Sequence, residues 1–168
     1  MLATKVFIDA FSPSDWPRAC AIYLEGILSG NATFETEPPS WDHWDRAHLP
    51  VGRLVARTDE GIIGWAALSP VSQRNCYAGV VEVSVYVATS ARGQGIGRTL
   101  LHEVVRISED RGIWTLQGSV FPENIASLRM CATQGFRQVG RRKHVAKLNG
   151  LWRDTILIER RSERVGVT

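Results

Sequence analysis

The sequence predicts a single α/β domain (α+β, with a mixed sheet), and two features of its element order indicate this. Segments with strand-like and helix-like patterns alternate along the 168 residues, but strands also follow one another directly in the middle of the chain and at its end. Strands joined by a tight turn are antiparallel neighbours, so the sheet is not the all-parallel type of doubly wound proteins. The chain has no internal repeat and no low-complexity linker. We therefore expect residues 1–160 to form one domain and residues 161–168 to be a disordered tail.

The expected elements follow from local patterns. Leu100 and Val104 belong to an apolar stripe with helical spacing, whereas the segment VVEVSVYV alternates as a strand does. Gly135 is well placed as the left-handed residue after a helix, and Asn149-Gly150 is a strong signal for a hairpin turn. The expected order is a strand at 5–10, helices within 12–30 and 40–49, strands at 53–58, 62–70 and 80–87, a helix ending near Gly112, a strand at 113–121, a helix at 123–135 and two strands within 136–159.

Composition excludes several classes of protein. No apolar run approaches the roughly 18 residues that a membrane helix needs, and the N-terminus lacks the apolar core and cleavage site of a signal peptide. The three cysteines are odd in number and widely spaced, which argues against a disulfide framework and fits a reducing cytoplasm. The four histidines show no metal-ligand spacing, so no metal site is expected.

Positive charge is concentrated near the C-terminus. Residues 137–164 contain nine Lys or Arg against three Asp or Glu, whereas the whole chain carries a net charge of only +3. This region could face a polyanion, either nucleic acid or a phosphorylated cofactor, or it could be a solvated strand face with a tail. No helix-turn-helix and no aromatic–basic RNA-binding signature accompanies it, so we expect no nucleic-acid partner.

Three glycines, Gly93, Gly95 and Gly97, stand where a predicted strand leads into a predicted helix. Glycines at such a place let backbone N–H groups converge on a ligand, and the positive end of the helix favours an anion. We therefore expect the loop to bind phosphate. The spacing G-x-G-x-G differs from the dinucleotide-binding G-x-G-x-x-G, and there is no G-K-[ST], so both a Rossmann site and a P-loop are excluded.

The segment RGQGIG, preceded by EVSVYV, resembles the pyrophosphate-binding loop of the GNAT superfamily of acetyl-CoA-dependent N-acetyltransferases, Q/R-x-x-G-x-G/A. A second block, ENIASLRMCATQGF, is similar to the downstream element of that superfamily, although its Asn124 could also be a plain helix cap. The resemblance implies acetyl-CoA as co-substrate and a six- to seven-stranded, mostly antiparallel sheet with about four helices. Its central strands would splay apart where the pantetheine arm pairs with them. The cofactor-binding residues that it implies are Val85, Tyr86, Val87, Arg92, Gly93, Gln94, Gly95, Ile96, Gly97, Asn124 and Ser127.

Further segments resemble one branch of this superfamily, the phosphinothricin acetyltransferases and their methionine sulfoximine and methionine sulfone relatives. NATFETEPPSW is similar to the branch's N-F-x-T-E-P, SQRNCYAGVVEVSVYV to its R-N-x-Y…E-x-x-V-Y-V, and KLNGLWRD to its K-x-G-x-W-x-D with one extra residue. The resemblance spans about residues 5–158. It implies a small amino-acid-like acceptor such as phosphinothricin, methionine sulfoximine or methionine sulfone.

The branch resemblance also implies that Glu82 is the general base that takes a proton from the acceptor amine. Its apolar neighbours Val81 and Val83 would desolvate the carboxylate and raise its pKa towards a useful value. By alternation Ser84 shares the face of Glu82 and is a candidate acceptor contact, whereas an outward-facing Glu82 is the structural alternative. Cys131 stands where other members place an acid for the leaving thiolate, but a small buried hydrophobe is the favoured interpretation.

Candidate acceptor contacts come from two loops. Arg74 is the best candidate for binding an acceptor carboxylate or phosphinyl oxygen, because its planar guanidinium matches such groups. Tyr77 would add a hydroxyl group. Phe34, Thr36 and Glu37 lie on the proline-bounded loop that would cover the acceptor, and each of them could instead anchor its own loop.

Two other functions stay open. An enzyme of the same superfamily could acetylate a peptide N-terminus or a polyamine, although Arg74 argues against an acidic polyamine pocket and the covering loop against an open peptide groove. A non-catalytic acyl-CoA sensor would lack a usable base, and Glu82 is present. The resemblance further implies a homodimer paired through C-terminal regions beside the acceptor site, and no membrane partner is expected.

Overall fold

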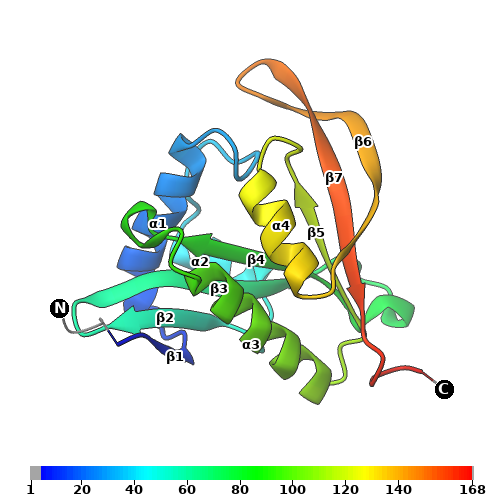
Figure 1. Ribbon diagram of the computed structural model, residues 1–168, viewed down its shortest axis with the longest axis horizontal. Coiled ribbons are helices and arrows are strands. Elements are labelled where there is room, and N and C mark those ends of the chain that lie inside the picture. The colour runs from blue at the N-terminus through cyan, green and yellow to red at the C-terminus, as the bar shows by residue number, and fades with distance from the viewer. Residues whose placement is uncertain (1–4, 168) are drawn as a thin grey trace.

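The structure is a computed structural model that describes residues 5–167, and within that range it contains a seven-stranded sheet and four α-helices (Figure 1). The strands are β1 (Phe7–Ala10), β2 (Leu54–Thr58), β3 (Gly61–Pro70), β4 (Val80–Val87), β5 (Thr115–Val120), β6 (Arg137–Leu148) and β7 (Leu151–Arg161). The helices are α1 (Trp16–Leu28), α2 (Trp41–Ala47), α3 (Ile96–Asp110) and α4 (Ile125–Thr133), with 3-10 turns at Pro13–Asp15, Asn75–Tyr77 and Thr89–Ala91. The predicted α/β mixed sheet is confirmed. Residues 1–4 and 168, which the expected domain and tail include, lie outside the described residues.

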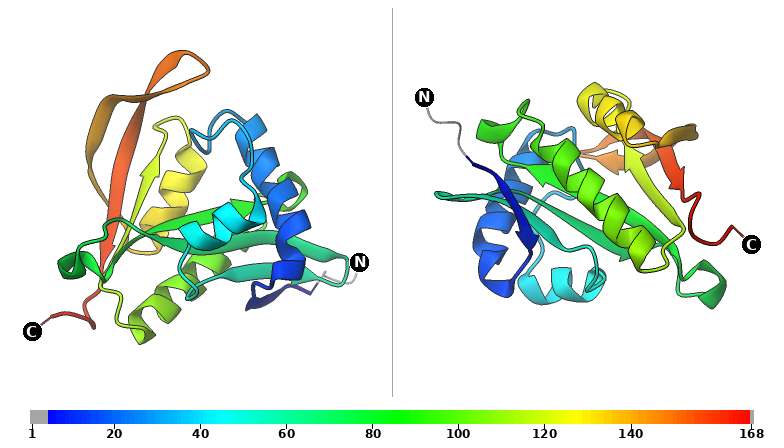
Figure 2. Two further views of the ribbon diagram at one scale, coloured as in Figure 1. Left: turned by 180° about the vertical axis from the view of Figure 1, so that it is seen from behind. Right: turned by 60° about the horizontal axis from the view of Figure 1, so that its bottom comes forward.

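Helices cover both faces of the sheet. α1 and α2 lie on one face and α3 and α4 on the other, as the front and back views show (Figures 1 and 2). α3 packs across β2, β3 and β4, and its Leu100 and Val104 are fully buried against the sheet. On the opposite face Trp44 of α2 and Trp65 of β3 are also buried, with their rings in edge-to-face contact at 5.6 Å. The sheet is therefore packed between two apolar layers.

The sheet is interrupted between its two central strands. The strand order is β1-β2-β3-β4-β5-β7-β6, with β4 and β5 parallel and the other neighbours antiparallel. β4 pairs with β3 as far as Val87, but with β5 it pairs only over residues Val80, Val81 and Glu82. Residues 83–87 therefore keep one edge without a strand partner. On the far side of this gap, the β6–β7 hairpin projects beyond the sheet at the top of Figure 1.

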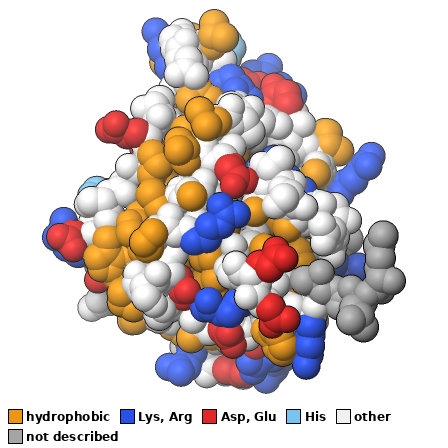
Figure 3. Space-filling model, turned by 90° about the vertical axis from the view of Figure 1, so that its left-hand side faces the viewer, with side chains coloured by type: hydrophobic (Ala, Val, Ile, Leu, Met, Phe, Trp, Pro, Cys, Tyr) orange, Lys and Arg blue, Asp and Glu red, His pale blue; other side chains and the backbone are white. Residues whose placement is uncertain are grey.

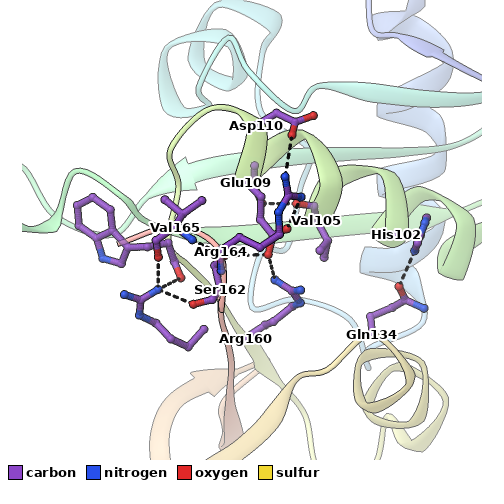
Figure 4. Close-up of polar contacts among 12 residues, drawn as sticks. His102, Val105, Glu109, Asp110, Gln134, Arg160, Ser162, Arg164 and Val165 are labelled. Carbon is purple, nitrogen blue, oxygen red and sulfur yellow. Dashed lines mark hydrogen bonds and ion pairs between the residues drawn. The ribbon is translucent and has the colours of Figure 1, made fainter. Parts of the chain in front are cut away.

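The chain after β7 is anchored to α3 by side-chain hydrogen bonds, within the segment 161–168 for which a disordered tail was expected. Glu109 of α3, whose side chain is only 7% exposed, accepts hydrogen bonds from Arg160 (2.9 Å), Ser162 (2.9 Å) and Arg164 (3.2 Å), as Figure 4 shows. Arg161 donates to the carbonyl oxygens of Trp114 and Val165. Arg160 and Arg164, two arginines of the basic C-terminal region, thus both pair with the buried carboxylate of Glu109.

Replacing Glu109 with Gln tests this anchor. Burial acts to raise the pKa of Glu109, but hydrogen bonds from Arg160 and Ser162 and the charges of Arg160 and Arg164 outweigh it and hold the pKa below its usual value of 4.5. The ionised carboxylate therefore stabilises the fold above pH 4.5, and this contribution is lost as the pH falls through the depressed pKa. We expect Glu109→Gln to lower the free energy of unfolding at pH 7 by about 1–3 kcal/mol in urea denaturation, with a difference that shrinks in acid.

The matched control is Glu103→Gln on the same helix. Glu103 pairs with Arg106, whose side chain is 54% exposed, so its loss should cost no more than about 0.5 kcal/mol. Equal effects of the two substitutions at pH 7 would contradict the anchoring role of Glu109.

Candidate functional site

The glycine loop shapes one end of a groove of about 550 Å³. Gly95 is the residue before α3 and has φ +80°, a left-handed conformation that favours glycine. Apart from the adjoining residues, a Cβ at Gly95 would meet no atom of the described chain within 4 Å, so the space in front of the loop is open. The first backbone N–H groups of α3 have no partner inside the helix and can bind an anion there. Figure 3 views the side on which this loop reaches the surface, where apolar side chains form a band flanked by charged ones.

Most of the predicted cofactor-binding residues line this groove. They are Val85, Tyr86, Val87, Arg92, Gly93, Gly95, Ile96, Gly97, Asn124 and Ser127. Gln94 does not line it, because its side chain turns back and donates to the carbonyl oxygen of Ser90 at 3.2 Å. Residues from α1, α3, α4 and the free edge of β4 thus meet along one channel.

A carboxylate from α1 fixes the entrance to the glycine loop. Glu25 accepts a hydrogen bond of 2.6 Å from the backbone N–H of Thr89, which begins the 3-10 turn before the loop. Glu25 was not predicted from the sequence, because its partner is 64 residues away and no local pattern relates the two.

Asn124 is the helix cap considered for it from the sequence, and it also contacts the loop after α1. Its Oδ1 accepts from the backbone N–H of Ser127, as a helix cap does, at 3.2 Å. Its Nδ2 donates to the carbonyl oxygen of Asn31 at 3.1 Å, which ties α4 to the loop that follows α1. The side chain therefore lies in the wall of the groove with both of its polar atoms engaged.

A cavity of about 430 Å³ adjoins the groove at the point where β4 and β5 separate. Glu82, Ser84, Phe34 and Cys131 line it, which brings together predicted residues from β4, the loop after α1 and α4. The cavity and the groove share the lining residues Ala32, Val85, Tyr86, Asn124, Ser127 and Met130. A ligand in the groove can therefore reach the carboxylate of Glu82.

The environment of Glu82 suits a proton acceptor. Burial raises the pKa of its carboxyl group, while the side chain of Gln117 and the charge of Arg142 act against this rise without cancelling it. Gln117 is the residue paired with Glu82 across the last step of the β4–β5 ladder. Glu82 lines the cavity, so the outward-facing alternative is not what the structure shows, and burial keeps the pKa of its carboxyl group above the usual value.

Cys131 lies in the cavity as a buried thiol. It is 6% exposed, and burial raises its pKa to about 11, against a small opposing effect of Ser127. The thiol therefore stays protonated at neutral pH. Its raised pKa also makes it a weak proton donor.

Another cavity, of about 520 Å³, adjoins the cavity that contains Glu82. It lies beside the aromatic side chains of Trp44, Trp65 and Tyr86. Glu37 and His43 line it, and the two cavities share Tyr23, Glu35 and Ser84, among others. His48 lines both cavities and was missed by the sequence analysis; burial lowers its pKa, the largest effect on it, and its Nδ1 lies 2.7 Å from the carbonyl oxygen of Trp44.

Three predicted acceptor residues lie away from both cavities. Thr36 is exposed in the loop between α1 and α2, and it is not part of either cavity wall. Arg74 and Tyr77 are exposed at the 3-10 turn between β3 and β4, where the Arg74 guanidinium carbon lies 5.5 Å from the centre of the Tyr77 ring. In a single chain, neither of them faces Glu82.

Two further classes of site find no support in residues 5–167. No group of three or more His, Cys, Asp and Glu side chains comes together there as metal ligands would. No helix in that range combines the length and the apolar character needed to cross a membrane.

Comparisons with known proteins agree with this geometry. The acetyltransferase (GNAT) family matches residues 15–136. A phosphinothricin N-acetyltransferase from Alcaligenes faecalis is 39% identical over 154 residues, which cover 87% of this chain and 77% of that protein. An L-methionine sulfoximine/L-methionine sulfone acetyltransferase from Pseudomonas aeruginosa is 27% identical over 154 residues, covering 87% and 88% of the two chains.

A solved structure extends the comparison to the fold and the co-substrate. The crystal structure of a GNAT superfamily phosphinothricin acetyltransferase from Sinorhizobium meliloti, in complex with acetyl-CoA, has a TM-score of 0.86 with this chain at 27% identity. The matched region covers 97% of this chain and 91% of the Sinorhizobium meliloti chain. The predicted resemblance and co-substrate are thereby confirmed. The chain belongs to the GNAT acetyltransferase family, and it is an N-acetyltransferase of the phosphinothricin acetyltransferase type whose co-substrate is acetyl-CoA.

Proposed function

We propose that this enzyme acetylates the amino group of a small amino-acid-like acceptor, such as L-phosphinothricin, methionine sulfoximine or methionine sulfone. The observation that carries this proposal is the position of Glu82, partly buried in a cavity that opens into the cofactor groove where β4 loses its strand partner. The names of the relatives from Alcaligenes faecalis and Pseudomonas aeruginosa support the acceptor class.

In this proposal the groove binds acetyl-CoA through backbone groups. The N–H groups of residues 92–97 and the start of α3 bind the pyrophosphate, because the glycines leave them accessible and the helix dipole favours negative charge. The unpaired edge of residues 83–87 pairs with the amides of the pantetheine arm as an added strand would. This arrangement directs the thioester towards the cavity that contains Glu82.

Within the cavity Glu82 accepts a proton from the acceptor ammonium, directly or through one water molecule, and the free amine attacks the thioester carbon. An N–C bond forms and the C–S bond breaks, and a backbone N–H near Val85 stabilises the oxyanion between the two events. The attacking nitrogen releases its second proton to solvent as the amide forms, and the thiolate of coenzyme A takes up a proton from solvent. Cys131 is a poor donor for it, because its pKa of about 11 lies above that of an ordinary thiol, about 8.5.

A second candidate acceptor is a cationic amine such as a polyamine. The two cavities beside Glu82 are lined by the carboxylates of Glu35, Glu37 and Glu82, and no Lys or Arg of the described chain lines either cavity. This charge distribution favours a positive ligand.

An anionic amino-acid acceptor needs a cation, and the described residues of a single chain supply none from the walls of these two cavities. We therefore propose a homodimer in which Arg74 of one chain binds the acceptor held by the other.

Glycine at position 95 is expected to be essential for binding acetyl-CoA. A valine there would place its side chain in the open space before the loop and would strain a residue with φ +80°. We expect Gly95→Val to weaken acetyl-CoA binding about 10- to 100-fold in calorimetry, because hydrogen bonds to a charged group are lost. Gly112→Val is the control, since Gly112 has φ +77° and equally open surroundings after α3. Normal binding by Gly95→Val would show that the loop assignment is wrong.

Removing the base should slow the chemical step without weakening cofactor binding. Glu82→Gln keeps the shape of the side chain but cannot accept a proton, so kcat at pH 7 should fall about 100- to 10,000-fold. In the wild type kcat/KM should fall as the pH drops through a pKa above 4.5, because burial raises the pKa of Glu82, and this dependence should vanish in Glu82→Gln. Cys131→Ala should keep most of the activity. If Glu82→Gln has near-normal rates between pH 6 and 9, another residue is the general base.

The proposed role of Arg74 is tested by mixing two impaired variants at an acceptor concentration below the KM of Arg74→Ala. Arg74→Ala alone should raise the acceptor KM about 100-fold while the KM of acetyl-CoA is unchanged, because a charge-assisted contact is lost. If Arg74 acts across a dimer, heterodimers of Arg74→Ala with Glu82→Gln regain one complete site, and mixing should restore activity. Light scattering should give the mass of a dimer. No restoration, or an Arg74→Ala enzyme that acetylates a neutral amine at the normal rate, would contradict the assignment.

A further inference from the structure

The loop that follows α1 forms one wall of the cavity around Glu82, yet it belongs to the half of the molecule opposite to β5. Its residues Ala32, Thr33, Phe34 and Glu35 line the cavity, whereas the facing wall comes from the end of β5 and from α4. Because β4 and β5 are not paired beyond Glu82, strand hydrogen bonds do not connect these two walls. Side chains must therefore set the distance between them.

Three contacts cross this gap. Arg153 of β7 donates from Nη1 to the carbonyl oxygen of Gly30 at 3.0 Å. Asn124 donates to the next carbonyl oxygen, that of Asn31, at 3.1 Å. The rings of Phe34 and Phe121 meet edge to face, with their centres 4.9 Å apart.

Arg153 is the residue that joins these contacts into one unit. Its guanidinium carbon lies 4.0 Å from the centre of the Phe121 ring, and its Nη2 donates to Glu123 at 3.2 Å. The side chain is only 21% exposed, and Phe121, which it covers, is 3% exposed and lines the cavity. A planar group that stacks on a ring while donating in two directions is what guanidinium provides and a lysine ammonium does not.

We propose that Arg153 is a positioning residue that holds the loop at residues 30–35 against Phe121 and so sets the width of the acceptor cavity. This proposal rests on the acetyl-transfer function proposed above. Arg153 reaches the backbone of Gly30 but does not line the cavity or the cofactor groove. Its effect on the reaction passes through the position of Phe34, which lines the cavity on the loop side.

Steady-state kinetics separate this role from a general effect on folding. Arg153→Met keeps the length and apolar character of the side chain but removes both donated hydrogen bonds. We expect the acceptor KM to rise about tenfold while kcat and the KM of acetyl-CoA change less than about twofold. Arg153→Lys should raise the acceptor KM less than Arg153→Met does, but should not restore the wild-type value. The control is Arg141→Met on the adjacent strand, where an exposed arginine pairs with Asp154 and does not contact the loop.

A second measurement reads the loop directly and needs no turnover. In hydrogen–deuterium exchange without ligands, the amides of residues 31–35 should exchange faster in Arg153→Met than in the wild type or Arg141→Met, with similar melting temperatures for the two variants. Unchanged exchange, or an acceptor KM equal to that of Arg141→Met, would overturn the proposal. If the wild type acetylates none of the acceptors tested, the proposed function fails instead, and the exchange comparison alone decides the role of Arg153.

Discussion

The separation of β4 from β5 after Glu82 is the constraint on which the site depends. An unpaired strand edge inside a sheet exposes backbone donors and acceptors that need partners, and water or a ligand must supply them. Here the free edge of residues 83–87 leads at one end to the glycine loop and begins at the other beside Glu82. One divergence of two strands thus places the glycine loop, an unpaired strand edge and a carboxylate along a single line.

Burial acts on two carboxylates of this chain with opposite outcomes. Glu109 and Glu82 are both withdrawn from solvent, which by itself raises a carboxyl pKa. Glu109 receives hydrogen bonds from Arg160 and Ser162, so its pKa is lowered and it fastens the C-terminal segment to α3. Glu82 has weaker compensation from Gln117 and Arg142, and its pKa stays raised. The first carboxylate serves stability, and the second is left able to exchange a proton.

Local patterns in the sequence predicted the order of elements, the glycine loop and the face shared by Glu82 and Ser84, because each depends on the spacing of neighbouring residues. Contacts between distant segments could not be predicted in this way. Arg153 and Gly30 are 123 residues apart, and no periodicity in either segment relates them. The same limit applies to the position of Arg74. Its loop leads into the strand that carries Glu82, which predicted a place near the acceptor, but at the 3-10 turn the Arg74 side chain lies on the surface of the single chain.

The proposed function depends on the binding of the pantetheine arm along the free edge of β4. Amide hydrogen exchange followed by NMR, with and without coenzyme A, tests it most directly. We expect strong protection of those amides of residues 83–87 that do not bond to β3, and little change at Val81, which pairs with both neighbouring strands. If calorimetry shows that coenzyme A is bound while these amides exchange at their original rates, the pantetheine arm does not bind along β4.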